Sequence, residues 1–228
     1  MSVRIPKGAT RITSLAFLND KTIVNFVIPS GVTTIGASAF AGCKNLESVS
    51  IPNSVDVIEE DAFRGCWKLT AVVVPKKVTV IPTGVFYGCK NLQTVVLPDE
   101  IAFIGDYAFY SCTNLMNFQL PAHLTHIGTG AFENCWSLDY VTITSGVEHV
   151  EEKAFANCSN LTLTVFANAN ALDGSAFLGC KRVIDVSRLD GALPVMAPPQ
   201  EDEPPLHIFT PENLAAMMVL HGMEPPEM

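Results

Sequence analysis

The chain has 228 residues, of which 48% are hydrophobic and 16% are charged, and its mean hydropathy is +0.30. A chain this long and this apolar can bury a sizeable core and is not disordered throughout. Its formal net charge is −9, so the chain lacks the excess of basic residues that binding to nucleic acid or anionic lipid requires. We expect neither as a partner.

The first segment, MSVRIPKGATRITSLAF, carries early charge and has no continuous apolar stretch followed by small residues. We therefore expect no secretory signal and a cytoplasmic location. The stretch between Lys21 and Lys44 has no charged residue, but Pro29 and Gly31 interrupt it together with several polar residues. A membrane span is not expected there.

A period of 23 residues begins at the N-terminus and runs through most of the chain. Prolines keep this spacing from Pro6 to Pro121, and phenylalanines keep it from Phe17 to Phe155. The cysteines also keep it, with a final step of 22: Cys43, Cys66, Cys89, Cys112, Cys135, Cys158 and Cys180. Three residue types sharing one period predict a solenoid of stacked coils.

Each repeat predicts a short strand, a return segment and a turn. In the repeat that starts at Leu46, Val49 and Ile51 alternate with serines, as in a strand with one buried face, and Pro52 ends the strand. The motif EEDAFRGC at 59–66 predicts a short helical or 3₁₀ turn. One coil offers about six apolar groups worth roughly 1.5–3 kcal/mol each, against about 1.5 kcal/mol of ordering entropy per residue, so a lone coil cannot fold.

The unit LESVSIPNSVDVIEEDAFRGCWK resembles the BspA-type leucine-rich repeat, and the resemblance covers roughly residues 3–184, or about eight coils. It implies a β-rich, right-handed solenoid with a parallel β-sheet on one side and short helical or 3₁₀ turns. It also implies a role in recognition and adhesion rather than catalysis. Since some members of this family lie on microbial or protist surfaces and bind host proteins, a cell-surface adhesin is the alternative to a cytoplasmic interaction scaffold.

The seven cysteines should form one buried file, because residues one period apart lie about 4.8 Å above each other. This spacing exceeds the roughly 3.5–4.5 Å between Cβ atoms of a disulfide, and an odd number of cysteines cannot pair completely. Zinc sites need converging ligands, which a linear file does not supply. We expect the thiols to act as small hydrophobic groups, with no metal and no cofactor. Asp20 takes the cysteine position in the first coil and is expected to cap the stack.

Exposed aromatic and apolar residues on this frame are the candidate contacts for a protein or peptide ligand. An ordinary solvated surface is the competing interpretation. The candidates are two tryptophans that follow cysteines, two tyrosines that follow phenylalanines, and residues of the expected sheet face: Trp67, Trp136, Tyr87, Tyr110, Tyr140, Val73, Val96 and Gln119.

His126 and His149 are also one period apart, which leaves a metal-binding protein as a further alternative. No arrangement of nucleophile and base and no glycine-rich phosphate loop is visible, so we do not expect an enzyme.

The repeat becomes irregular after Leu161. Either Leu163 and Val165, or Thr164 and Phe166, could point inward in the last coil. We therefore expect a solenoid over residues 1–187, a proline-rich acidic linker over 188–209 and a helix over 210–223. That helix would either cap the solenoid or bind a partner, and the protein is expected to be a monomer.

Overall fold

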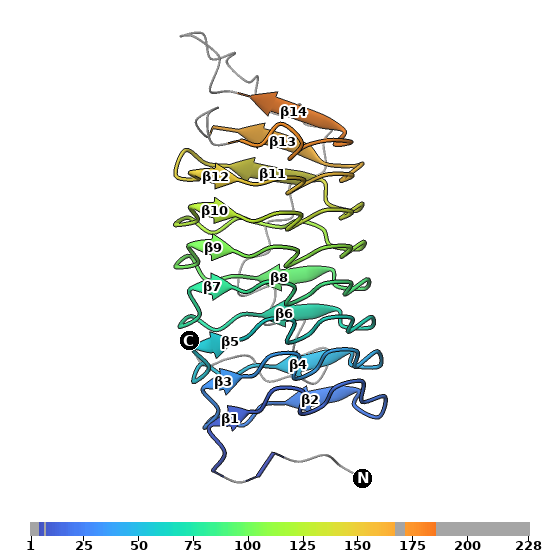
Figure 1. Ribbon diagram of the computed structural model, residues 1–228, viewed down its shortest axis with the longest axis vertical. Helices are drawn as coiled ribbons and strands as arrows, with labels where there is room; N and C mark the ends of the chain where they lie inside the picture. Colours follow the sequence, from blue (N-terminus) through green and yellow to red (C-terminus); the bar gives the residue numbers. More distant parts are fainter. Residues whose placement is uncertain (1–4, 7, 167–171, 186–228) are drawn as a thin grey trace, which may run out of the picture. The chain divides into compact units, whose positions relative to one another are not determined.

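The computed structural model describes residues 5–6, 8–166 and 172–185, all within the first of two compact units, residues 1–188. These residues form a parallel β-solenoid of about seven turns, in which each coil stacks on the one before it (Figure 1). The linker and the C-terminal helix expected from the sequence lie outside the described residues. Within the described residues there is no helix long and apolar enough to cross a membrane.

One side of the solenoid carries the longer strands, which form two separate parallel sheets (Figure 1). The first sheet contains β2 (Asn25–Val27), β4 (Ser48–Ser50), β6 (Ala71–Val73) and β8 (Thr94–Val96). The second contains β11 (Tyr140–Ile143), β13 (Thr162–Val165) and β14 (Arg182–Asp185). The middle residue of each strand in the first sheet is buried and its neighbours are more exposed, as the alternating sequence predicts.

The other side carries two-residue strands, also in two parallel sheets. One contains β1 (Arg11–Ile12), β3 (Thr34–Ile35) and β5 (Val57–Ile58). The other contains β7 (Val80–Ile81), β9 (Phe103–Ile104), β10 (His126–Ile127) and β12 (His149–Val150). Paired residues such as Ile35 and Ile58 are one period apart, so the sequence period is the register of the stack.

The last coils shorten the period without losing the buried pattern. Tyr140 pairs with Thr162, and Thr162 pairs with Arg182. The sequence separation between paired residues therefore falls from 23 to 22 and then to 20. Of the two inward-facing patterns expected there, the structure adopts the first. Leu163 and Val165 are fully buried, whereas Phe166 is 46% exposed.

The turn predicted to be helical is a run of hydrogen-bonded turns, and the described residues contain neither an α-helix nor a 3₁₀ helix. In this turn the Phe63 N–H donates to the carbonyl of Val85, and the Gly65 N–H donates to the carbonyl of Tyr87. Because these N–H groups bond to the next coil, they are not available for a continuous helix. The structure does not support the helical part of the prediction, because every second N–H group of the turn bonds across coils rather than along the turn.

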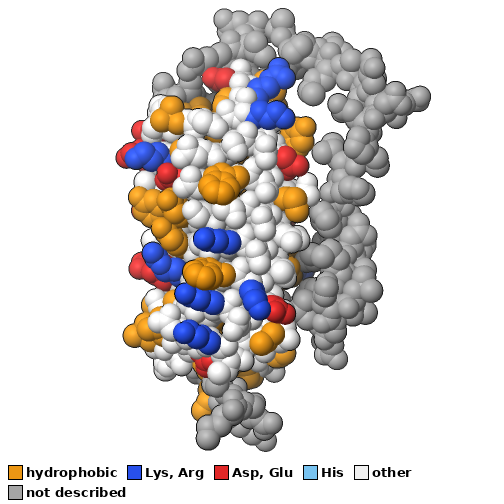
Figure 2. Space-filling model, turned by 90° about the vertical axis from the view of Figure 1, so that its right-hand side faces the viewer, with side chains coloured by type: hydrophobic (Ala, Val, Ile, Leu, Met, Phe, Trp, Pro, Cys, Tyr) orange, Lys and Arg blue, Asp and Glu red, His pale blue; other side chains and the backbone are white. Residues whose placement is uncertain are grey.

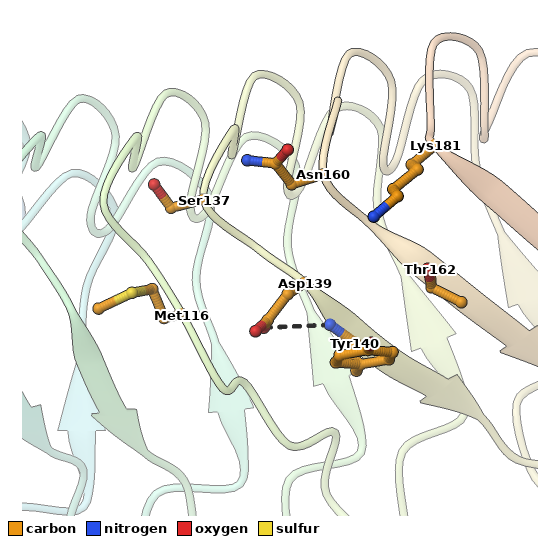
Figure 3. A pocket seen from close by; sticks show the side chains of 7 residues that line it. All are labelled: Met116, Ser137, Asp139, Tyr140, Asn160, Thr162 and Lys181. Atoms are coloured by element: carbon orange, nitrogen blue, oxygen red, sulfur yellow. Dashed lines mark hydrogen bonds between the residues drawn. The ribbon is translucent and has the colours of Figure 1, made fainter. Parts of the chain in front are cut away.

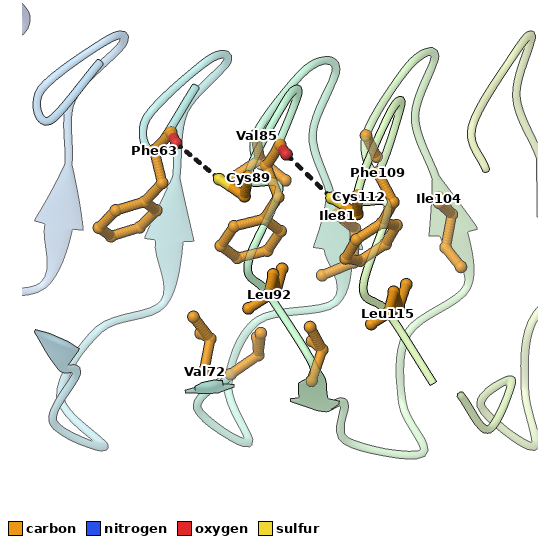
Figure 4. Close-up of a cluster of buried hydrophobic side chains, with 14 of the residues drawn as sticks. Phe63, Val72, Ile81, Val85, Cys89, Leu92, Ile104, Phe109, Cys112 and Leu115 are labelled. Atoms are coloured by element: carbon orange, nitrogen blue, oxygen red, sulfur yellow. Dashed lines mark hydrogen bonds between the residues drawn. The ribbon is translucent and has the colours of Figure 1, made fainter. Parts of the chain in front are cut away.

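The core contains stacked phenylalanine and cysteine files packed among leucine, isoleucine, valine and alanine side chains (Figure 4). Successive phenyl rings from Phe40 to Phe155 lie 4.9–5.8 Å apart, centroid to centroid. All seven cysteines are free, and six are buried. Each thiol also donates to a backbone carbonyl of the preceding coil, as Cys89 does to Phe63 over 3.1 Å. The buried file is confirmed, and its thiols are hydrogen-bond donors as well as apolar filling.

The first coil ends the cysteine file with a carboxylate. Asp20 accepts hydrogen bonds from the backbone N–H and the hydroxyl of Thr22, at 2.7 and 2.6 Å. These bonds lower the pKa of the Asp20 carboxyl below its usual value. An ionised, hydrogen-bonded side chain at this position fits the polar cap expected from the sequence.

The long-strand side is interrupted at Asn117 and Phe118, where one continuous sheet was expected. Asn117 has a left-handed φ of 48°, and residues 117–119 form no strand. Phe118 is buried edge-on against Phe109 and Phe132, where the neighbouring coils have valine. Asn25 and Phe26 hold the same two positions within the regular strand β2, so neither residue by itself explains the break. Asparagine tolerates left-handed backbone better than most residues, and this tolerance permits the detour.

Candidate functional site

The residue after each cysteine, or after Asp20 in the first coil, points outward, and this column forms an edge rich in lysine and tryptophan. We call it the Lys–Trp edge; it comprises Lys21, Lys44, Trp67, Lys90, Trp136 and Lys181. Figure 2 shows basic and hydrophobic side chains alternating along the middle of one face of the solenoid. The sequence singled out the two tryptophans, but the lysines were missed as part of the site. Their spacing of one period on either side of Trp67 was the available signal.

Trp67 is 44% exposed and lies between two lysines from the adjacent coils. The Nζ atom of Lys44 is 4.0 Å from the centroid of the Trp67 ring, and the Nζ atom of Lys90 is 5.5 Å from it. Both distances are within the range of cation–π attraction, which is worth about 0.5–1 kcal/mol at exposed sites. Trp67 thus attracts a positive charge from the coil on either side of it.

Trp136 lies three coils beyond Trp67, or about 15 Å along the stack. Its neighbours in the column are the short side chains of Thr113 and Ser159, and it is 53% exposed. The Thr113 hydroxyl donates to the backbone carbonyl of Lys90. Trp136 therefore has no long side chain from its own column beside it, in contrast to Trp67.

Tyr87 and Tyr110 form a stacked pair in the neighbouring column, with ring centroids 4.6 Å apart. The guanidinium carbon of Arg64 lies 4.0 Å from the centroid of the Tyr87 ring. Tyr107 meets Tyr110 edge-on at 6.0 Å and is 40% exposed. Tyr107 was not predicted, because its column otherwise holds glycine, aspartate and other non-aromatic residues. The stacking predicted for the first two tyrosines is present, and both are half-buried.

The predicted residues of the sheet face do not form one surface. Val73 and Val96 are paired neighbours in β6 and β8 and are half-buried, so a small valine patch exists. Gln119 is exposed, but it lies in the interruption and belongs to neither sheet. The break at Asn117 separates Gln119 from the valines in the strand ladder.

A polar hollow opens beside the interruption (Figure 3). It has a volume of about 430 Å³, and its lining is mostly hydroxyl, amide and charged groups: Met116, Ser137, Asp139, Tyr140, Asn160, Thr162 and Lys181. Tyr140 is 62% exposed, and its backbone N–H donates to the Asp139 carboxylate over 3.1 Å. Lys181 belongs both to the hollow and to the Lys–Trp edge, so the two features are continuous.

The lysines of the Lys–Trp edge are exposed and lack carboxylate partners within the described part of the chain. No described carboxylate comes within 4.0 Å of the ammonium groups of Lys21, Lys44, Lys90 or Lys181. Lys68 lies near this edge but pairs with Glu47 at 3.5 Å. The net negative charge of the chain therefore coexists with a local cationic stripe.

The histidine pair forms as the period predicts. The His126 and His149 rings lie 4.7 Å apart, Phe103 stacks on His126, and the Glu151 carboxylate is 3.3 Å from Nε2 of His126. In the described ranges no three metal-ligating side chains converge. The structure thus places the two rings together without a third ligand for a metal.

Comparison with known proteins points to one type of repeat. The model of the BspA type leucine rich repeat region matches residues 1–112 and 79–187, with six copies. No curated protein matches the chain.

Several solved bacterial structures share the fold. A leucine rich cell surface protein from Faecalibacterium prausnitzii is 27% identical, with a TM-score of 0.58 over 78% of this chain and 59% of its own. The leucine rich repeat protein of T. pallidum is 27% identical, with a TM-score of 0.50 over 78% of this chain and 72% of its own. A leucine-rich repeat protein from Eubacterium ventriosum is 25% identical, with a TM-score of 0.63 over 86% of this chain and 50% of its own. The chain thus spans little more than half the length of the Faecalibacterium prausnitzii protein and half the length of the Eubacterium ventriosum protein.

Proposed function

Because the chain belongs to the BspA-type leucine-rich repeat family, we propose that it is a non-enzymatic recognition protein of the cell surface whose solenoid binds a protein ligand. The observation that carries the proposal is the exposure of Trp67, Trp136 and Tyr140 on a frame whose repeated residues are buried. Trp and Tyr are the residues most enriched among those that dominate binding energy at protein interfaces.

The repeat supports recognition because it separates structural from variable positions. The phenylalanine and cysteine files are almost invariant and lie inside, so they fix the frame. The outward columns change from coil to coil, as in the series Lys44, Trp67, Lys90. A rigid frame with variable outward residues can present a specific surface at little entropic cost on binding.

The proposed location replaces the cytoplasmic one expected from the sequence, which the comparisons do not support. The similar protein from Faecalibacterium prausnitzii is described as a cell surface protein. Protease treatment of intact cells tests the location: loss of the solenoid from intact cells supports the surface, and its survival until lysis contradicts it.

Binding is tested by capture with purified wild type and a Trp67→Ala, Trp136→Ala, Tyr140→Ala triple variant. The matched control removes exposed apolar groups on the short-strand side, Val57→Ala and Val80→Ala. We expect a protein that the wild type and the control retain and the triple variant loses. A ligand retained equally by all three, with melting temperatures unchanged, would place recognition elsewhere.

A further inference from the structure

We propose that the Lys–Trp edge and the polar hollow together bind an acidic polysaccharide, a ligand distinct from the protein ligand proposed above. The edge would contact the anionic groups of the polymer, and the hollow would hold one of its sugar units.

The charge pattern of the edge matches a linear polyanion. Lys44 and Lys90 are two coils apart, or about 10 Å, and the Trp67 ring between them attracts both ammonium groups. Lys21 and Lys181 extend the same column toward the two ends of the solenoid. Cations aligned in this way attract anions repeated along an extended polymer, even though the whole chain carries a charge of −9.

The lining of the hollow favours a sugar over an acidic peptide. Ser137, Asn160 and Thr162 supply hydroxyl and amide groups that can both donate and accept, as sugar hydroxyls require. Asp139 adds a carboxylate that accepts from sugar hydroxyls. Apart from Met116 and the Tyr140 ring, its lining offers no large apolar group against which a peptide anchor residue could pack.

The position of Trp136 connects the two parts. It precedes Ser137 of the hollow in the sequence, and its neighbours in the column are short. Its indole can therefore meet the C–H face of a sugar ring, since aromatic faces carry partial negative charge and C–H groups are weak donors. In this arrangement Trp67 orders the lysines, whereas Trp136 contacts the sugar.

The experiment measures binding of the full chain to four probes: a heparin oligosaccharide, polygalacturonate, poly-L-glutamate and neutral dextran. We expect at least one of the two acidic polysaccharides to bind more tightly than poly-L-glutamate, and dextran not to bind. Trp136→Ala should weaken that binding about tenfold without changing its salt dependence, because it removes an uncharged contact.

The charge component is tested by Lys44→Ala, Lys90→Ala against the matched control Lys76→Ala, Lys77→Ala, which removes two exposed lysines elsewhere. The first variant should lose about tenfold in affinity and show a weaker salt dependence, and the control should lose much less. Equal losses in the two variants would show a net-charge effect and overturn the site. Poly-L-glutamate binding as tightly as the polysaccharides, or no binding to either polysaccharide, would overturn the ligand.

Discussion

The thiol of Cys112 donates a hydrogen bond to the backbone carbonyl oxygen of Phe86, 3.2 Å away in the preceding coil. That oxygen also accepts a hydrogen bond from the N–H of Cys89, so the thiol donates to the second lone pair of the oxygen. The same bond recurs in every repeat that has a cysteine, from Cys43 to Cys180. Cysteine suits this column because it is small and apolar and still joins one coil to the next.

Replacing Cys112 tests whether the file is buried. Cys112→Ala should cost about 1–3 kcal/mol, because a small cavity forms and one weak hydrogen bond is lost. Cys112→Asp should unfold much of the array, because no described group near this site can pair with a buried carboxylate. Urea unfolding followed by circular dichroism measures both. Equal tolerance of the two substitutions would contradict burial.

Thiol ionisation predicts how stability depends on pH. Burial raises the pKa of the Cys89 and Cys135 thiols from an ordinary value of 9.0 to about 12. A raised pKa in the folded state means that the folded protein binds more protons than the unfolded chain above pH 9. Stability from these groups is therefore complete below pH 9 and is lost between pH 9 and about 12.

The measurement is the urea midpoint at a series of pH values, with Cys89→Ala as the comparison. The variant should be less stable at pH 8 but should lose less stability than the wild type as the pH rises to 11. In parallel, a thiol reagent at pH 8 should label the denatured chain at once and the native chain slowly. Prompt labelling of most thiols in the native state would rule out the buried file.

The stacking could be predicted from the sequence because a period of 23 residues fixes which side chains lie over each other. Phe63 and Cys66 could therefore be assigned to the core with no knowledge of the backbone. The turn around Asp61 and Gly65 could not be predicted correctly, because every second N–H group in it bonds to the next coil. The period alone could have predicted the Lys44–Trp67 contact. It could not have predicted the polar hollow, whose lining includes Met116 beside the unforeseen break at Asn117.

Two glycines at left-handed positions of the turns allow the cost of backbone strain to be measured separately from the cost of a steric clash. Gly88 has φ of +68°, and an added Cβ would meet no atom within 4 Å. Gly88→Ala should therefore cost about 1 kcal/mol from conformation alone. Gly130 has φ of +57°, and its added Cβ would lie 2.7 Å from the Tyr107 ring, so Gly130→Ala should cost more. Thermal unfolding of the two variants measures the difference; equal costs would show that the Tyr107 ring moves aside freely.

The interruption of the long-strand side should be reversible by copying the sequence of β8. Asn117→Thr and Phe118→Val together reproduce Thr94 and Val95, the residues one period earlier. Threonine disfavours the left-handed backbone seen at Asn117, and valine removes the ring wedged against Phe109 and Phe132. The two sheets should then join, and the amides of residues 117–119 should exchange with solvent more slowly.

Amide hydrogen exchange compares this double variant with Phe26→Val, which makes the same truncation inside the regular strand β2. The control should lose about 1–3 kcal/mol of stability without new protection, because only a cavity is created. In the double variant, the added strand bonds should offset part of that cost. If residues 117–119 gain no protection, the break is imposed by the packing of the neighbouring coils rather than by Asn117 and Phe118. Because Met116 lines the polar hollow beside the break, joined sheets should also change polysaccharide binding there, which links the local backbone at Asn117 to the proposed site.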